Sequence, residues 1–143
     1  LILVGDSVGM TIYGHENTLG VTLDMMINHG KAVAQNAKNA CVVVDMPIGT
    51  YERSMDEAVE NAARIMHLSG CDAVKLVGGE IMAGTINHIV KHSIPVMGHI
   101  GLMPQSFSKA EKYRIAGKTP ESEEQLLRDA RALQDAGAFF FFF

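Results

Sequence analysis

The stretch Leu1–Met10, LILVGDSVGM, decides how the rest of the chain is interpreted. Four apolar residues lead into Gly5, and a short apolar run that ends at glycine is typical of a buried parallel strand. Asp6 and Ser7 follow at once, at the point where strands of α/β proteins present ligand-binding groups. The sequence therefore predicts that both residues lie at the carboxyl end of a strand, facing a site. A turn in which they only bond nearby backbone is the alternative that this stretch leaves open.

Composition limits the class of protein. The chain has 143 residues, enough for one domain with a core, and its formal net charge is −4. No basic run and no long apolar run appears, so neither nucleic acid nor a membrane is an expected partner. Cys41 and Cys71 lie in apolar surroundings, and we expect buried free thiols in a reducing cytoplasm. Because the chain starts inside a strand and ends in Phe139–Phe143, we expect residues 1–143 to be a single, incomplete domain.

Apolar runs that alternate with helical patterns predict four strand–helix pairs and a fifth strand. The predicted strands are Leu1–Val4, Cys41–Val44, Ala73–Val77, Ile94–Met97 and Phe139–Phe143. The predicted helices follow Thr18–Leu23, begin at a capping box at Ser54–Glu57, span Ile81–His92, and begin at the cap Thr119 after a loop from Gly101 to Lys118. The predicted core face of the last helix is Leu126, Leu127, Ala130 and Leu133. Strands that alternate with helices indicate a parallel sheet, either open and doubly wound or closed as a (β/α)₈ barrel.

Polar side chains mark the first four predicted strands. Asp6 and Ser7 follow the first, Asp45 follows the second, Lys75 lies within the third and His99 follows the fourth. In a (β/α)₈ barrel the carboxyl ends of the strands form the active face. Two carboxylates on adjacent strands suit Mg²⁺, while a lysine can balance a substrate carboxylate or an enolate, or form a Schiff base. A histidine can donate a hydrogen bond or move a proton. The pair Gly78-Gly79 is a weaker candidate, as a phosphate cradle.

Several motifs occur in order along nearly the whole chain. They are Val4–Met10, Gly14-His15, Val44–Pro47, Ala73–Leu76 with Gly78–Glu80, and Val96–Gln105. Together they closely resemble the 3-methyl-2-oxobutanoate (ketopantoate) hydroxymethyltransferase family. The resemblance implies a (β/α)₈ TIM barrel of the phosphoenolpyruvate mutase and isocitrate lyase type, with about five of its strands in this chain. It also implies transfer of a hydroxymethyl group from 5,10-methylenetetrahydrofolate to 3-methyl-2-oxobutanoate, giving 2-dehydropantoate for pantothenate synthesis, in a Mg²⁺-dependent cytoplasmic homo-oligomer, commonly a decamer.

The same resemblance implies roles for individual residues. Asp6 and Asp45 match the metal ligands and also contact the oxo acid. Ser7 and Lys75 match substrate-binding residues, and His99 matches a histidine beside the substrate, so that Lys75 and His99 are the catalytic candidates in this chain. The chemistry is consistent with these roles, because a 2-oxo acid can chelate Mg²⁺ through its carboxylate and keto oxygens.

Two departures from the family pattern matter. The family usually has a glutamate, a third acidic group at the metal, where this chain has Val77. Its general base is a glutamate beyond the next strand, outside these residues. We therefore expect the 143 residues alone to be inactive.

Other functions stay open at this point. One is a serine esterase with Ser7 as nucleophile, although the late Asp-x-x-His that it needs is absent from this sequence. Another is an aldolase that forms a Schiff base through Lys75. A third alternative is a metal-poor paralogue that only binds small oxo acids. A fourth is another 2-oxo-acid lyase or mutase of the same barrel superfamily.

Overall fold

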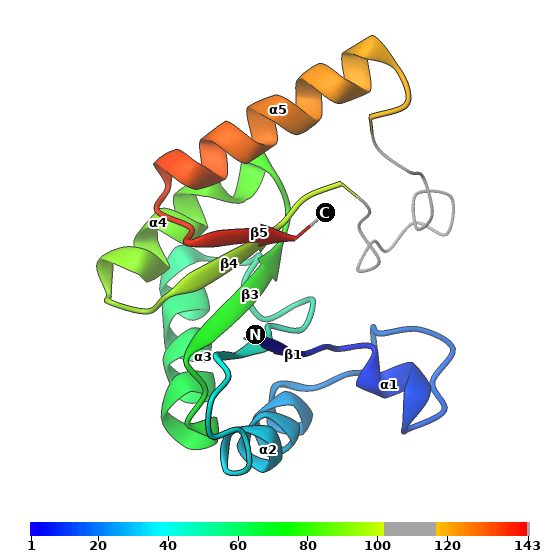
Figure 1. The fold of residues 1–143 in the computed structure, drawn as a ribbon, viewed down its shortest axis with the longest axis vertical. Coiled ribbons are helices and arrows are strands. Elements are labelled where there is room, and N and C mark those ends of the chain that lie inside the picture. Colours follow the sequence, from blue (N-terminus) through cyan, green and yellow to red (C-terminus); the bar gives the residue numbers. More distant parts are fainter. Residues whose placement is uncertain (102–116, 143) are drawn as a thin grey trace.

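Strand order decides between the two architectures. The computed structural model describes residues 1–101 and 117–142. Within these ranges β1 (Ile2–Val4), β2 (Val42–Asp45), β3 (Ala73–Val77), β4 (Val96–His99) and β5 (Phe140–Phe142) form one sheet (Figure 1). Every neighbouring pair is parallel, and the spatial order follows the chain. A doubly wound sheet reverses its strand order, whereas a barrel does not. The chain is therefore an arc of a (β/α)₈ TIM barrel.

The helices connect and cover the strands. They are α1 (Val8–Thr11), α2 (Leu23–Ala34), α3 (Met55–Ser69), the 3₁₀ helix η1 (Glu80–Met82), α4 (Ala83–Lys91) and α5 (Pro120–Asp135). The longer helices α2 to α5 contact one another in chain order along one face of the curled sheet (Figure 1). None of the helices in the described ranges combines the length and the apolar composition that a membrane span requires.

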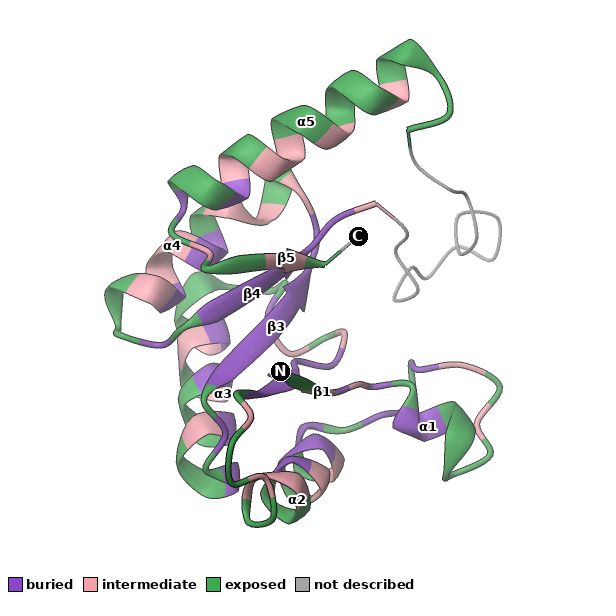
Figure 2. Cartoon of the chain, in the orientation of Figure 1, coloured by how far each residue is buried: buried purple, intermediate pink, exposed green. Residues whose placement is uncertain are grey.

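The central strands are buried on both faces. Successive side chains of a strand point to opposite faces. Val44, Val74 and Leu76 belong to the large core cluster beneath the helices. Val43 and Met97 belong to a smaller cluster, with Leu3 packed against it. Figure 2 shows the resulting contrast between the buried strands β3 and β4 and the more exposed edge strand β5. Burial on both faces explains why these strands are nearly continuous apolar runs.

Several predicted helix ends are confirmed. Thr119 caps α5 and Pro120 is its first residue. Ser54 caps α3 by accepting a hydrogen bond from the Glu57 amide at 3.1 Å. The reciprocal half of the predicted capping box is wrong, because the Glu57 carboxylate instead accepts from Arg53 Nε at 2.8 Å. At the other end of α3, Gly70 adopts a φ of 72°, a left-handed conformation that glycine adopts without strain.

Several boundaries differ from prediction. The observed strand β4, Val96–His99, begins two residues later than the predicted Ile94–Met97 and includes Gly98. The strands β1, β2 and β5 each begin one residue later than predicted. The predicted helix Ile81–His92 is divided between η1 and α4. Most of the predicted loop Gly101–Lys118 lies outside the described residues.

Two predictions of burial are wrong. Leu127 is 52% exposed, because the buried face of α5 contains Leu126 and Leu133, and Leu127, the next residue after Leu126, points to the side of that face. Cys41 is exposed, since it precedes β2 at the rim of the sheet, where its carbonyl accepts a hydrogen bond from the Ile2 amide. Cys71 is buried as predicted, and burial raises the pKa of its thiol.

We expect Gly98→Ala to destabilise the protein by about 1–3 kcal/mol, because overpacking in a filled core costs that much. An added Cβ at Gly98 would lie 2.6 Å from Cδ1 of the fully buried Leu133, which packs α5 onto β4. The control is Gly84→Ala on the exposed side of α4, where the Cβ would meet only the flexible end of Met55. That variant should gain up to about 1 kcal/mol from helix propensity. Urea denaturation of both variants measures the difference, and equal stabilities would contradict it.

Candidate active site

A single cavity contains the five polar residues that the sequence predicted at the strand ends. It has a volume of about 190 Å³ and lies at the carboxyl ends of the strands. Its lining includes Asp6, Ser7, Asp45, Lys75 and His99. All of them except Ser7 are buried. The residues converge because neighbouring parallel strands place their carboxyl ends at the same edge of the sheet.

Strand register sets which side chains meet. Asp45, the last residue of β2, lies directly opposite Lys75 of β3. Val77, the last residue of β3, lies opposite His99, the last residue of β4. Lys75 and Val77 are two positions apart, so both side chains point to the same face of the sheet. That face carries the cavity, and the opposite face packs under the helices.

The Asp45 carboxylate is the electrostatic centre of the cavity. Its Oδ1 forms an ion pair with the Lys75 ammonium, and both side chains are 4% exposed. Its Oδ2 accepts a hydrogen bond of 3.0 Å from the backbone amide of Asp6. Removing one partner of a buried ion pair leaves the other charge buried without compensation, which lowers the free energy of unfolding by about 3–5 kcal/mol. The Asp45 carboxylate therefore links three segments: the end of β2, Lys75 of β3, and the loop after β1.

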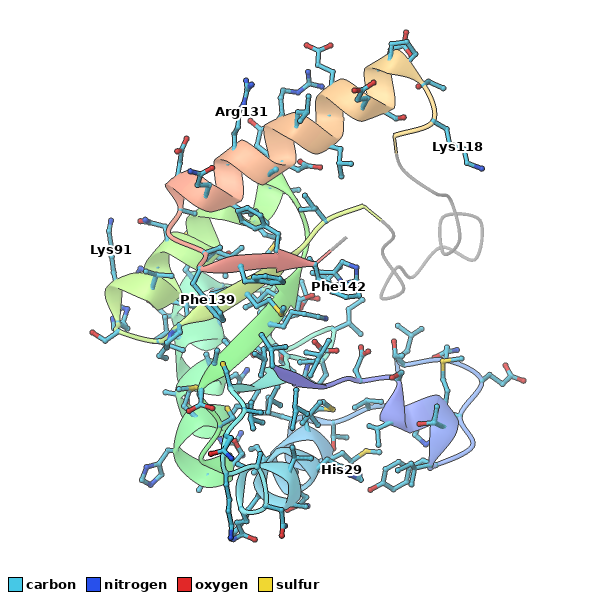
Figure 3. The ribbon with its side chains drawn as sticks, viewed as in Figure 1. His29, Lys91, Lys118, Arg131, Phe139 and Phe142 are labelled. Carbon is cyan, nitrogen blue, oxygen red and sulfur yellow. The ribbon has the colours of Figure 1, made fainter. Side chains whose placement is uncertain are left out.

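Apolar side chains complete the walls. Leu3, Val77 and Phe142 line the cavity beside the polar residues. Phe142, at the end of β5 (Figure 3), meets the His99 ring edge-on, with the ring centroids 5.2 Å apart. Sequence reasoning predicted a strand here but no site residue, because a phenylalanine within a phenylalanine run carries no distinguishing signal. At Gly5 an added Cβ would lie 3.1 Å from Ser7 Oγ, so glycine lets the backbone turn closely under the cavity.

The donor set fits a Mg²⁺ ion bound by two carboxylates. In residues 1–101 and 117–142 no three His, Cys, Asp or Glu side chains are grouped as a metal site. Mg²⁺ needs no such cage, because it is usually held by one or two carboxylates and keeps water or substrate oxygens as its other ligands. Asp6 and Asp45 line the same cavity, which is large enough for an ion and a small acid. Hard oxygen ligands of this kind favour Mg²⁺ over softer metals.

A larger hollow of about 560 Å³ lies between η1 and α5, and it is lined by Gly78, Gly79 and Asp129 among others. The Asp129 carboxylate accepts a hydrogen bond of 2.9 Å from the Glu80 amide, where an anion would bind. A Cβ on Gly79 would lie 2.1 Å from this carboxylate. The suggestion that Gly78-Gly79 cradles phosphate is therefore wrong, because a helix carboxylate occupies that position.

Fold and site together define a (β/α)₈-barrel protein whose polar cavity pairs carboxylates with a buried lysine. The chain belongs to the ketopantoate hydroxymethyltransferase family, whose profile matches residues 1–143. The proteins named 3-methyl-2-oxobutanoate hydroxymethyltransferase from Rhizobium etli and Brucella canis are 57% and 52% identical to it over 139 residues, which is 97% of this chain. The chain spans about half the length of these relatives, 51% and 50% respectively. The family predicted from the motifs is thus confirmed.

Proposed function

We propose that the whole polypeptide, the product of the complete gene containing these residues, transfers a hydroxymethyl group from 5,10-methylenetetrahydrofolate to 3-methyl-2-oxobutanoate. The product is 2-dehydropantoate. The observation that carries this proposal is the convergence of two aspartates, a lysine and a histidine in one cavity of a chain from this family. The polar groups suit the carboxylate and keto oxygens of the oxo acid. The apolar walls suit its branched alkyl group.

Each polar side chain has a role in this proposal. Asp6 and Asp45 would hold Mg²⁺, which when bound supplies Lewis-acid stabilisation of negative charge on the oxo acid. The Lys75 ammonium contributes a second positive charge from a buried position, where electrostatic interactions are stronger than in water. Ser7 donates a hydrogen bond to the substrate carboxylate. His99 donates a hydrogen bond at the keto oxygen.

The bond changes require one group beyond these residues. The proton on C3 of the oxo acid leaves to a glutamate that we place outside the present chain. The C3 carbon bonds to the methylene carbon of the folate, both bonds from that carbon to the folate nitrogens break, and water supplies the hydroxyl group. The C3 proton and the second proton of water end on the two folate nitrogens, so tetrahydrofolate leaves. While negative charge develops on C3 and the keto oxygen, the Lys75 ammonium stabilises it electrostatically, and His99 donates a hydrogen bond to the keto oxygen.

Isotope exchange tests the first chemical step. The whole polypeptide, incubated with Mg²⁺ and 3-methyl-2-oxobutanoate in D₂O, should exchange the C3 proton, which NMR follows. Adding 5,10-methylenetetrahydrofolate should then yield 2-dehydropantoate. A folded polypeptide that accelerates neither exchange nor product formation would refute the proposed reaction.

Val77 favours a second candidate function, the binding of small oxo acids without turnover. Its apolar side chain lines the cavity beside Asp45 and Lys75, so the strand contributes no third carboxylate there. Isothermal titration separates the two functions. Oxo-acid binding that is independent of Mg²⁺, in a polypeptide that does not exchange the C3 proton, would support binding alone.

We expect Val77→Glu to tighten Mg²⁺ binding by about 10–100-fold, the range that groups around a metal site commonly contribute. Val77 is 8% exposed and lies in the cavity wall with the two aspartates, so a carboxylate there would face the ion or its waters. Val77→Gln is the control, because it adds a side chain of similar length without the charge. Titration calorimetry with Mg²⁺ measures all three proteins. Equal affinities would mean that the metal does not use this position.

We further propose that the whole polypeptide assembles as a cytoplasmic homo-oligomer, with the family resemblance as the support. Light scattering of the purified product measures its mass. A monomer at micromolar concentration would refute the oligomer.

A further inference from the structure

Strand β3 continues beyond the end of its neighbour β2. Asp45 and Lys75 are paired in register, and the Met46 amide donates to the Lys75 carbonyl at 2.9 Å. The chain then turns away at Pro47, whose carbonyl accepts from the Thr50 amide. In a parallel ladder, alternate residues bond to opposite neighbouring strands. The amide and carbonyl of Val77 therefore point toward β2 at a level that β2 no longer reaches.

The side chain of Tyr51 replaces the missing strand. Its hydroxyl accepts from the Val77 amide and donates to the Val77 carbonyl, both at 3.4 Å. A hydroxyl can do both because it has one proton and two lone pairs. Tyr51 is 2% exposed, and burial raises the pKa of its phenol, with smaller contributions from the charges of Glu52, Asp45 and Asp6. The phenol consequently keeps the proton that it donates.

The segment that carries Tyr51 is anchored independently of Val77. The Thr50 hydroxyl donates to the Pro47 carbonyl at 2.6 Å, and Asn61 of α3 donates to the Thr50 carbonyl at 2.8 Å. Removing the phenol oxygen therefore leaves the segment bonded to Pro47 in the turn after β2 and to α3. This makes Tyr51→Phe a local change at the end of β3.

We propose that Tyr51 is a positioning residue for the oxo-acid site, acting through the backbone of Val77. Val77 lies two residues after Lys75 on the same face of β3, and its side chain lines the cavity with His99. By holding this end of β3, the phenol fixes the distance of Lys75 and Val77 from the Asp45 side of the cavity. The inference rests on the proposed function, since the oxo acid is the ligand whose binding reports the geometry.

The test compares Tyr51→Phe with Tyr13→Phe in the whole polypeptide. Tyr13 is the matched control, because its hydroxyl bonds to His29 (Figure 3) on a different part of the surface. Tyr51→Phe should raise the KM for 3-methyl-2-oxobutanoate about fivefold or more, as expected when a hydrogen bond that orders the site is lost. Tyr13→Phe should leave it within twofold. A merely structural loss lowers the amount of active protein, and thus the apparent kcat, without changing KM.

If the Tyr51→Phe variant does not fold, a spectroscopic measurement on the folded protein tests the same proposal. All tyrosines of the otherwise wild-type whole polypeptide, three of which lie in these 143 residues, are replaced by fluorotyrosine, and the resonances are assigned with Tyr→Phe variants that fold. The ¹⁹F resonance of Tyr51 should shift on addition of the oxo acid, and that of Tyr13 should not. An unshifted Tyr51 resonance, or an unchanged KM in folded Tyr51→Phe, overturns the positioning role alone. Wild-type protein that binds no oxo acid overturns the proposed function and this role with it.

Discussion

Asp45→Asn should abolish Mg²⁺-dependent turnover of the whole polypeptide, with a loss of at least about a hundredfold, because one substitution removes a proposed metal ligand and the charge beside Lys75. Asp45 is 3% exposed, and its two oxygens contact Lys75 and the amide of Asp6. The amide of asparagine cannot neutralise the ammonium. We therefore expect a loss of about 3–5 kcal/mol in the free energy of unfolding, the cost of a buried charge without its partner.

The control is Asp24→Asn, which removes a carboxylate from an exposed ion pair with Arg64 at 3.2 Å. Such a pair contributes at most about 1 kcal/mol. Urea denaturation and Mg²⁺ titration of both variants measure the two effects separately. If Asp45→Asn and Asp24→Asn lost the same stability and bound Mg²⁺ equally, Asp45 would have neither role.

Local sequence patterns predicted the elements well because those patterns have local causes. The sequence predicts Ala73–Val77 residue for residue, since a mostly apolar run is bounded by Asp72 and Gly78. Gly98 shows the limit of such reasoning. The pattern predicts that the strand ends before Gly98, yet Gly98 lies inside β4, because its missing side chain makes room for Leu133 of a helix far along the chain. A contact between distant segments has no signature in the local pattern.

Strand order could not be deduced from alternation alone. The same succession of strands and helices fits an open or a closed sheet, and only the pairing of β1 with β2 and onward in sequence separates them. The resemblance of the motifs to a family of barrel proteins predicts the closed sheet. This is why the fold prediction succeeded although the residues by themselves left both architectures open.

The candidate site was predictable as a set of residues but not as a set of contacts. Asp6, Asp45, Lys75 and His99 share the cavity because each lies at or near the end of a strand. The ion pair between Asp45 and Lys75 depends on register, which a one-residue slip would have broken. Tyr51 carried no signal at all, because its role depends on β3 being longer than β2.

Lys75→Met should raise the KM for 3-methyl-2-oxobutanoate more than about tenfold, since hydrogen bonds to charged groups contribute about 1.5–3 kcal/mol. Methionine preserves most of the side-chain volume in a cavity where Lys75 is 4% exposed. The variant should also lose stability, because Asp45 then keeps a buried charge without its ion-pair partner. Lys91→Met is the control, on an exposed lysine at the end of α4 that points away from the sheet (Figure 3).

The role of Lys75 as a charge rather than an imine-forming nucleophile is tested by reduction. Borohydride added to wild-type protein with the oxo acid should leave the mass of the protein unchanged, because in the proposed reaction the electron sink is the charge around the substrate oxygens and no Schiff base forms. An adduct that appears in the wild type and disappears in Lys75→Met would instead identify an aldolase-type mechanism. Unchanged KM and kcat in Lys75→Met would remove Lys75 from the site altogether. The combination expected here is a raised KM, no adduct, and a Lys91→Met variant that behaves as wild type, because Lys75 is the lysine that pairs with Asp45 in the cavity among the residues that the structure describes.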